Sequence, residues 1–172
     1  YQLELLENVY ERDCADTEEI VLDFTGDVNL AEGWSTTKYM DQQENGIYDC
    51  LSANLVMELQ GADILMVNNE YAYSDRGYPL PGKTYTFRAM PTRVQVLQQI
   101  GTDVVSLANN HGYDYGEDAL LDTLETLENV GIPYVGAGRN LKEAEKIVYF
   151  IANGRKIAIV AATQIERFES FT

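Results

Sequence analysis

Residues 102–111 read TDVVSLANNH, an apolar run that stops at two asparagines and the only histidine of the chain. A short valine-rich run bounded by polar residues is typical of a buried β-strand. We predict that this strand leaves the core at Asn109 and that its end opens into a polar site. The alternative is that Asn109 and Asn110 form a simple turn and that His111 has a structural role.

Similar runs recur along the chain and predict three further strands, at residues 20–27 (IVLDFTGD), 62–70 (ADILMVNNE) and 132–138 (IPYVGAG). Helices are predicted between them, at residues 47–61, 91–101 and 116–131, and each of these segments ends at a glycine. Strands that alternate with helices favour parallel pairing through crossover connections. The predicted fold class is therefore α/β, a layered sandwich of a mostly parallel sheet with helices.

The two ends of the chain give weaker or more local signals. We predict that residues 1–18 are a lead-in segment, either mobile or a short packed helix. Residues 19–172 are predicted to belong to the domain itself. Asn140 and Glu143 match a capping box that opens a short helix. The pair Asn153-Gly154 predicts a β-hairpin within residues 146–163.

Polar side chains follow three consecutive predicted strands at the point where each strand ends. Because the carboxyl ends of parallel strands meet at one edge of a sheet, we expect these side chains to converge. Oxygen ligands with one imidazole suit a divalent metal such as Mn, Mg or Zn, and a metal would relieve repulsion between carboxylates. The converging residues are Asp27, Asn29, Asn68, Asn69, Glu70, Asn109, Asn110 and His111.

Charge and composition exclude several classes of partner. The formal net charge is -16 over 172 residues, and a field of this sign repels nucleic acid and anionic membrane surfaces. No run of 18 apolar residues predicts a membrane span, and Tyr1 in place of methionine suggests processing, so we expect any anchor upstream of this chain.

Cys14 and Cys50 match no zinc or redox motif, and two unpaired thiols are the simpler interpretation.

A set of short motifs carries a family resemblance. GDVNLA at 26–31, NNE at 68–70, FRAMP at 87–91, ANNHGYDYG at 108–116 and GIPYVGAGRNLKEAEK at 131–146 stand in order along the chain. Together they resemble the CapA family of bacterial capsule synthesis proteins, which is associated with poly-γ-glutamate. The fold of that family is similar to that of calcineurin-like metallophosphoesterases. The resemblance covers about residues 19–162.

The resemblance implies roles for individual residues. Asp27 and Glu70 become candidate metal carboxylates, with Asn29 beside them. Asn110 and His111 are similar to the Asn-His pair of metallophosphoesterases, in which the Asn binds metal and the His protonates the leaving group. Two departures are that Asn29 stands where those enzymes have a histidine, and that no histidine follows His111. We therefore expect this chain to be the N-terminal part of an incomplete domain.

The segment 71–91 contains aromatic side chains together with Arg76, Lys83 and Arg88 in an otherwise acidic chain. Such side chains suit an anionic polymer, so we predict that Lys83 and Arg88 bind substrate, with Asn69 and Asn109 beside them. The alternative is a long surface loop with packed tyrosines.

Two functions follow from the sequence and its resemblance. The first is an extracytoplasmic, metal-dependent hydrolase-like protein of capsule or poly-γ-glutamate synthesis or export, with His111 as the catalytic acid. The second is a non-catalytic cell-surface scaffold that binds polymer or synthase partners. The expected partners are poly-γ-glutamate or capsular polysaccharide and a membrane synthase complex, without nucleic acid. A cytoplasmic phosphatase is disfavoured because the sequence contains no complete binuclear metal site.

Overall fold

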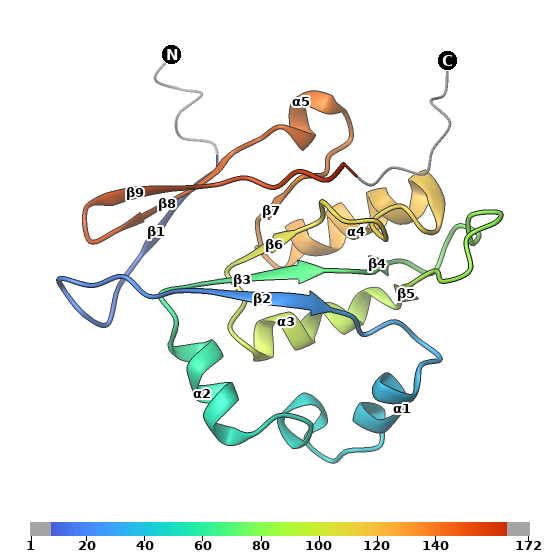
Figure 1. The fold of residues 1–172 in the computed structure, drawn as a ribbon, viewed down its shortest axis with the longest axis horizontal. Coiled ribbons are helices and arrows are strands. Elements are labelled where there is room, and N and C mark those ends of the chain that lie inside the picture. Colours follow the sequence, from blue (N-terminus) through green and yellow to red (C-terminus); the bar gives the residue numbers. More distant parts are fainter. Residues whose placement is uncertain (1–7, 165–172) are drawn as a thin grey trace.

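A four-stranded parallel sheet forms the centre of the computed structural model, which describes residues 8–164 (Figure 1). Its strands are β2 (Leu22–Val28), β3 (Ile64–Asn69), β6 (Val104–Ser106) and β7 (Tyr134–Val135), in the order β2-β3-β6-β7. All three pairings are parallel. The predicted α/β class, the alternation of strands and helices and the parallel pairing are confirmed.

Helices cover one face of this sheet. They are α1 (Ser35–Asp41), α2 (Ala53–Gly61), α3 (Gln95–Gln99) and α4 (Gly116–Asn129), with 3-10 turns η1 (Gly46–Asp49) and η2 (Pro91–Val94). Figure 1 shows α1, α2 and α3 on the same side of β2 and β3. One apolar cluster joins α2, α3 and α4 to the sheet through Leu59, Leu97, Leu124, Leu127, Leu65, Val67 and Val105. Alternation along β3 therefore sends every second side chain to the helices.

The opposite face of the sheet is covered by a second, smaller sheet. Its strands are β1 (Val9–Arg12), β8 (Val148–Ala152) and β9 (Arg155–Ile159), in the order β1-β8-β9. Strands β8 and β9 are antiparallel, and Asn153 and Gly154 at their turn have φ angles of 48° and 70°. The predicted hairpin is confirmed, although it lies in a separate layer. A second apolar cluster joins the layers through Ile64, Val104, Val135, Val148, Phe150 and Ile159.

The lead-in segment contains a strand, so the prediction of a mobile segment or a short helix is wrong for residues 9–12. Strand β1 pairs in parallel with β8, from Val9 opposite Tyr149 to Arg12 opposite Ala152. Tyr10 packs on Phe150 at 5.7 Å between ring centroids, and Arg12 forms an ion pair of 2.7 Å with Asp103. Residues 1–7 lie outside the described part of the chain.

The predicted helix at residues 47–61 begins later than its apolar spacing suggested. Ser52 caps α2 by accepting a hydrogen bond of 3.2 Å from the backbone of Leu55, which restricts the helix to Ala53–Gly61. Gly61 is the last helical residue and is not in the left-handed conformation, in contrast to Gly101 and Gly131. Cys14 and Cys50 are both free thiols.

Two short elements complete the described chain. Strands β4 (Ala72–Tyr73) and β5 (Arg88–Ala89) pair in parallel and bring together the ends of the long segment 71–91. Helix α5 (Leu141–Ala144) is capped by Asn140, whose side chain accepts a hydrogen bond of 3.0 Å from the backbone of Glu143, as the sequence predicted. Within residues 8–164, none of the helices is long and apolar enough to cross a bilayer.

Candidate functional site

The carboxyl ends of β2, β3 and β6 lie side by side, as the parallel topology predicted. Asp27 stands opposite Asn68, Val28 opposite Asn69, and Asn68 opposite Ser106. The register shifts between Phe24 and Asp27, so the last residues of β2 are offset from the rest of the strand. The three strand ends therefore place their polar residues at one edge of the sheet.

A chain of hydrogen bonds connects the side chains at this edge. Asn68 Nδ2 donates to Asp27 Oδ1 at 2.6 Å. Asn109 Nδ2 donates to Asn68 Oδ1 at 3.1 Å and to the backbone oxygen of Asn69 at 2.9 Å. Asn109 Oδ1 in turn accepts from the backbone nitrogen of His111 at 2.9 Å. These bonds fix the turn that carries His111, so Asn109 positions the histidine.

His111 is buried, and its two ring nitrogens have different surroundings. Nδ1 lies 2.7 Å from Asp114 Oδ2, whereas Nε2 lies 3.8 Å from Glu70 Oε1, beyond hydrogen-bonding distance. Because Asp114 also accepts from a lysine and a backbone N–H, its carboxylate acts as an acceptor and Nδ1 carries the proton. The ring of Phe87 lies 4.2 Å from the imidazole, centroid to centroid. His111 therefore has a fixed tautomer and directs Nε2 toward Glu70.

Asp114 is the central residue of this arrangement and was absent from the predicted site. Its side chain is fully buried and forms an ion pair with Lys83. It also accepts a hydrogen bond of 2.7 Å from the backbone of Phe87. A buried carboxylate requires such partners, because desolvation of an unpaired charge is costly. The spacing His-x-x-Asp in HGYD was the only sequence signal for it.

The predicted metal residues have mixed surroundings. Asp27 is exposed, and Glu70 lies beside His111 Nε2. Asn29 stabilises a local turn, because its Oδ1 accepts from Ala31 at 3.0 Å and its Nδ2 contacts the Glu70 carbonyl at 3.5 Å. Asn110 is exposed, and its backbone oxygen accepts from Lys83. Their roles as ligands stay predictions.

The donor set is short of a complete metal site. Within residues 8–164, no three His, Cys, Asp or Glu side chains are grouped closely enough to hold a metal ion. The amide oxygens of Asn68 and Asn109 already accept hydrogen bonds. Asp27 and Glu70 supply two carboxylates, fewer than the three protein ligands that a catalytic zinc site keeps. The acidic, histidine and cysteine side chains of residues 8–164 do not by themselves form a complete site.

The predicted substrate-binding residues are largely engaged in structural contacts. Asn69 is fully buried and donates to the Tyr71 carbonyl at 2.7 Å. The Lys83 ammonium group donates hydrogen bonds to Asp114 and to the Asn110 carbonyl. Arg88 donates to the Arg76 carbonyl at 2.6 Å, and its guanidinium stacks 4.3 Å from the centre of the Tyr115 ring. Their binding of substrate stays a prediction.

Below the edge, two buried tyrosines contribute neutral hydrogen-bonding groups. The hydroxyls of Tyr71 and Tyr73 lie 2.7 Å apart, and the rings meet edge to face. Burial raises the pKa of both phenols above the ordinary value of 10.0. Both groups are therefore uncharged at neutral pH and serve the core rather than proton transfer.

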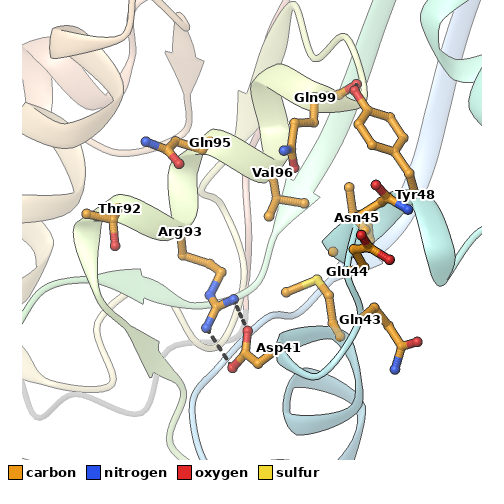
Figure 2. A pocket seen from close by; sticks show the side chains of 13 residues that line it. Asp41, Gln43, Glu44, Asn45, Tyr48, Thr92, Arg93, Gln95, Val96 and Gln99 are labelled. Atoms are coloured by element: carbon orange, nitrogen blue, oxygen red, sulfur yellow. Dashed lines mark hydrogen bonds and ion pairs between the residues drawn. The ribbon is translucent and has the colours of Figure 1, made fainter.

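A separate polar groove of about 630 Å³ lies between α1–η1 and η2–α3 (Figure 2). Figure 2 shows Arg93 reaching across it to Asp41, where both carboxylate oxygens accept hydrogen bonds from the guanidinium. Tyr48 closes another side by donating to the Gln99 carbonyl at 3.0 Å. None of the predicted site residues lines this groove, so the strand-end edge remains the candidate site.

Comparison with known proteins gives a consistent family assignment. The capsule biosynthesis protein CapA of Bacillus anthracis is 32% identical over 108 residues, which is 61% of this chain and 26% of that protein. A probable polyglutamine synthesis accessory protein of Mycobacterium tuberculosis is 31% identical over 111 residues, 64% of this chain and 29% of that protein. The PGA biosynthesis protein CapA of Bacillus subtilis is 33% identical over 91 residues, 52% and 24% respectively.

The chain thus spans about a quarter of the length of the curated relatives it matches. The family described as bacterial capsule synthesis protein PGA_cap matches residues 21–171. This range includes the whole strand-end edge and every strand of the two sheets apart from β1. This chain therefore belongs to the PGA_cap family of bacterial capsule synthesis proteins.

Proposed function

We propose that this chain is a hydrolase-like part of a protein that makes or exports a capsule polymer outside the cytoplasm. Family membership supports the link to capsule synthesis. The single observation that supports chemistry is the orientation of His111, which Asp114 holds at 2.7 Å while Nε2 is directed toward Glu70. An imidazole with one bound and one available nitrogen is suited to general acid–base catalysis.

The proposed proton transfer uses only Nε2 of His111. Asp114 accepts a hydrogen bond from Nδ1–H and stabilises the imidazolium when Nε2 is also protonated, and Lys83 compensates the charge of Asp114. The hydrogen bond from the backbone of His111 to Asn109 holds the ring at the strand end. A leaving group that approaches Nε2 from the open side of the edge, beside Glu70, would receive its proton from a protonated His111.

A divalent cation, Mn, Mg or Zn, is a further part of the proposal. Asp27 and Glu70 are the carboxylates that would hold it, because both lie at the strand-end edge and oxygen ligands suit such ions. Since these residues do not complete a site, any metal binding would need ligands beyond them.

The proposed partners are an anionic capsule polymer, poly-γ-glutamate or a polysaccharide, and a membrane synthase complex at the cell surface. The family is one of capsule synthesis, and a capsule lies outside the cell. The proposed anchor lies upstream of this chain. With a net charge of -16, the chain would approach a polyanion only through bound cations or local contacts.

A second candidate is a non-catalytic scaffold that binds polymer or synthase partners. The observation that favours it is the hydrogen-bond network in which Asn109 donates to Asn68 and Asn68 donates to the Asp27 carboxylate. Side chains that are already hydrogen-bonded in this way stabilise an edge without needing a ligand.

The decisive experiment compares hydrolysis with binding. The chain and His111→Ala would be incubated with γ-linked oligoglutamate and with p-nitrophenyl phosphate, and binding of the oligoglutamate would be measured by calorimetry. Loss of a general acid should reduce turnover by about 100-fold or more and leave binding unchanged. Lys142→Ala, on the exposed face of α5, is the matched control. Binding without turnover in the unmodified chain would overturn the hydrolase and favour the scaffold.

A further inference from the structure

An aromatic row extends from His111 to the surface of the strand-end edge. The Phe87 ring packs on His111 at 4.2 Å, Trp34 meets Phe87 edge to face at 5.5 Å, and Tyr85 lies 6.1 Å from Trp34, all between centroids. Trp34 follows β2, whereas Tyr85 and Phe87 precede β5. Two loops from different parts of the chain therefore build one continuous row.

The outer end of the row is open to solvent. Trp34 is 42% exposed and Tyr85 is 59% exposed, whereas Phe87 is partly buried and His111 is buried. Tryptophan is highly buried on average in folded proteins, so a half-exposed one in contact with a second exposed ring makes an unusual apolar surface. We name Trp34 and Tyr85 the aromatic shelf.

Backbone contacts hold the two loops of the shelf together. Glu32, two residues before Trp34, donates its backbone N–H to the Arg88 carbonyl at 2.9 Å. Glu32 Oε1 also accepts from the backbone of Met90 at 3.0 Å. These bonds fix the Trp34 loop against β5, so the shelf is formed before a ligand arrives and saves ordering entropy on binding.

The charges around the shelf disfavour a polyanionic ligand. Segment 71–91 carries three cations, and each is engaged: Lys83 with Asp114, Arg76 with Asp118 and Asp122, and Arg88 with two carbonyls and Tyr115. Glu70 and Asp27 add negative charge at the same edge, in a chain of net charge -16. Lys38, one helical turn after Trp34, adds one exposed cation, but the two carboxylates outweigh it, so a carboxylate-rich chain would meet net repulsion here.

A neutral sugar ring suits these surroundings better. One face of a pyranose consists of C–H groups that pack on an aromatic ring, and its hydroxyls can hydrogen-bond to nearby polar groups without adding charge. Ligand sites in proteins combine aromatic side chains with a few polar groups in this manner. We propose that the aromatic shelf binds a neutral sugar ring, so that the polymer handled beside His111 contains carbohydrate.

This inference deepens the proposed role in capsule polymer handling, but it concerns binding and does not require hydrolysis. Trp34 is the only tryptophan of the chain, so its fluorescence reports directly on the shelf. The whole chain would be titrated with maltohexaose, cellohexaose and chitohexaose, and separately with γ-linked hexaglutamate. We expect a saturable shift of the Trp34 emission to shorter wavelength with at least one of the three sugars.

Two variants distinguish the shelf from the rest of the segment. Tyr85→Ala should weaken the sugar affinity about tenfold, because one stacking partner is lost. Tyr78→Ala is the matched control, since Tyr78 lies in the same segment, is 89% exposed and belongs to none of the ring pairs of the row. Calorimetry on Trp34→Ala gives a second measurement that does not depend on fluorescence.

The possible results have separate meanings. His111→Ala should keep the sugar-induced shift of the Trp34 emission. Absence of hydrolysis would therefore not contradict sugar binding by the aromatic shelf. No saturable shift with any of the three sugars would overturn the inference. A shift with hexaglutamate alone that Tyr85→Ala removes would assign the shelf to a polyamide and would also overturn it.

Discussion

His111 Nδ1 and Asp114 Oδ2 lie 2.7 Å apart, three positions from one another in the sequence. This bond determines which ring nitrogen faces Glu70, and it places a buried carboxylate directly behind the only histidine of the chain. The chemistry proposed for the edge therefore depends on Asp114 and, through it, on Lys83, which lies on another loop.

The ion pair between Lys83 and Asp114 gives the first prediction. Lys83→Met should lower the free energy of unfolding by about 3–5 kcal/mol, because it leaves a fully buried carboxylate without its cation. Urea unfolding measures the change. Lys142→Met, an exposed lysine on α5, should change stability by less than about 0.5 kcal/mol. Equal losses in the two variants would show that the buried pair is not the cause.

Gly77 gives a prediction about backbone packing. Its φ is +79°, and a Cβ at this position would clash with the backbone oxygen of Tyr115, so Gly77→Ala should destabilise the chain by about 2–4 kcal/mol. Gly82→Ala is the matched control, because Gly82 has a φ of +77° in the same segment but open space where a Cβ would stand. It should cost only about 1 kcal/mol. The difference in melting temperature isolates the clash.

Asp122 gives a prediction about pH. Hydrogen bonds from Arg76, and a further one from Ser74, hold the pKa of Asp122 below its ordinary value of 3.8. A lowered folded-state pKa contributes stability above the unfolded pKa, and this contribution is lost as the pH falls through the folded value. Asp122→Asn should therefore cost about 1 kcal/mol at pH 7, since Arg76 is half exposed, and progressively less below about pH 4.

The control for this pH dependence lies in the same ion-pair group. Asp118 is more exposed than Asp122 and contacts Arg76 at 3.3 Å, so Asp118→Asn should have a small effect at every pH. Chemical denaturation between pH 7 and pH 3 compares the variants. A stability difference for Asp122→Asn that stays constant across this range would contradict the assignment to its charge.

Metal titration gives the fourth prediction. Calorimetric addition of Mn, Mg or Zn to the metal-stripped chain should show weak binding, because two carboxylates are an incomplete ligand set. Asp27→Asn should reduce that affinity at least about tenfold, whereas Glu145→Gln, an exposed carboxylate on another surface, should leave it unchanged. Equal affinity in both variants would exclude Asp27 as a ligand.

The parallel sheet could be predicted from sequence because its strands are continuous apolar runs between helices. Val104 and Val105 are both fully buried, one toward the helices and one toward the second sheet, as expected for a strand covered on both faces. The convergence of Asp27 and Asn68 followed from this topology alone, because parallel strands end at the same edge.

The parts that could not be predicted depend on contacts between distant segments. Strand β1 has only four residues, and it is stabilised by pairing with β8 and by the ion pair of Arg12 with Asp103. Similarly, HGYD does not reveal that Asp114 is buried, because Lys83 and Phe87 come from a different loop. Local sequence patterns carry no information about such partners.

The pairing of Val9 with Tyr149 also has a consequence for the order of folding. Strand β1 and the β8–β9 hairpin come from opposite ends of the described chain, so the second sheet can close only after nearly all of the intervening chain has become compact. Contacts between such distant residues form slowly, because the entropy of closing the intervening loop is lost first. The second sheet is thus expected to form last, and amide hydrogens of β1 to exchange earlier than those of β3.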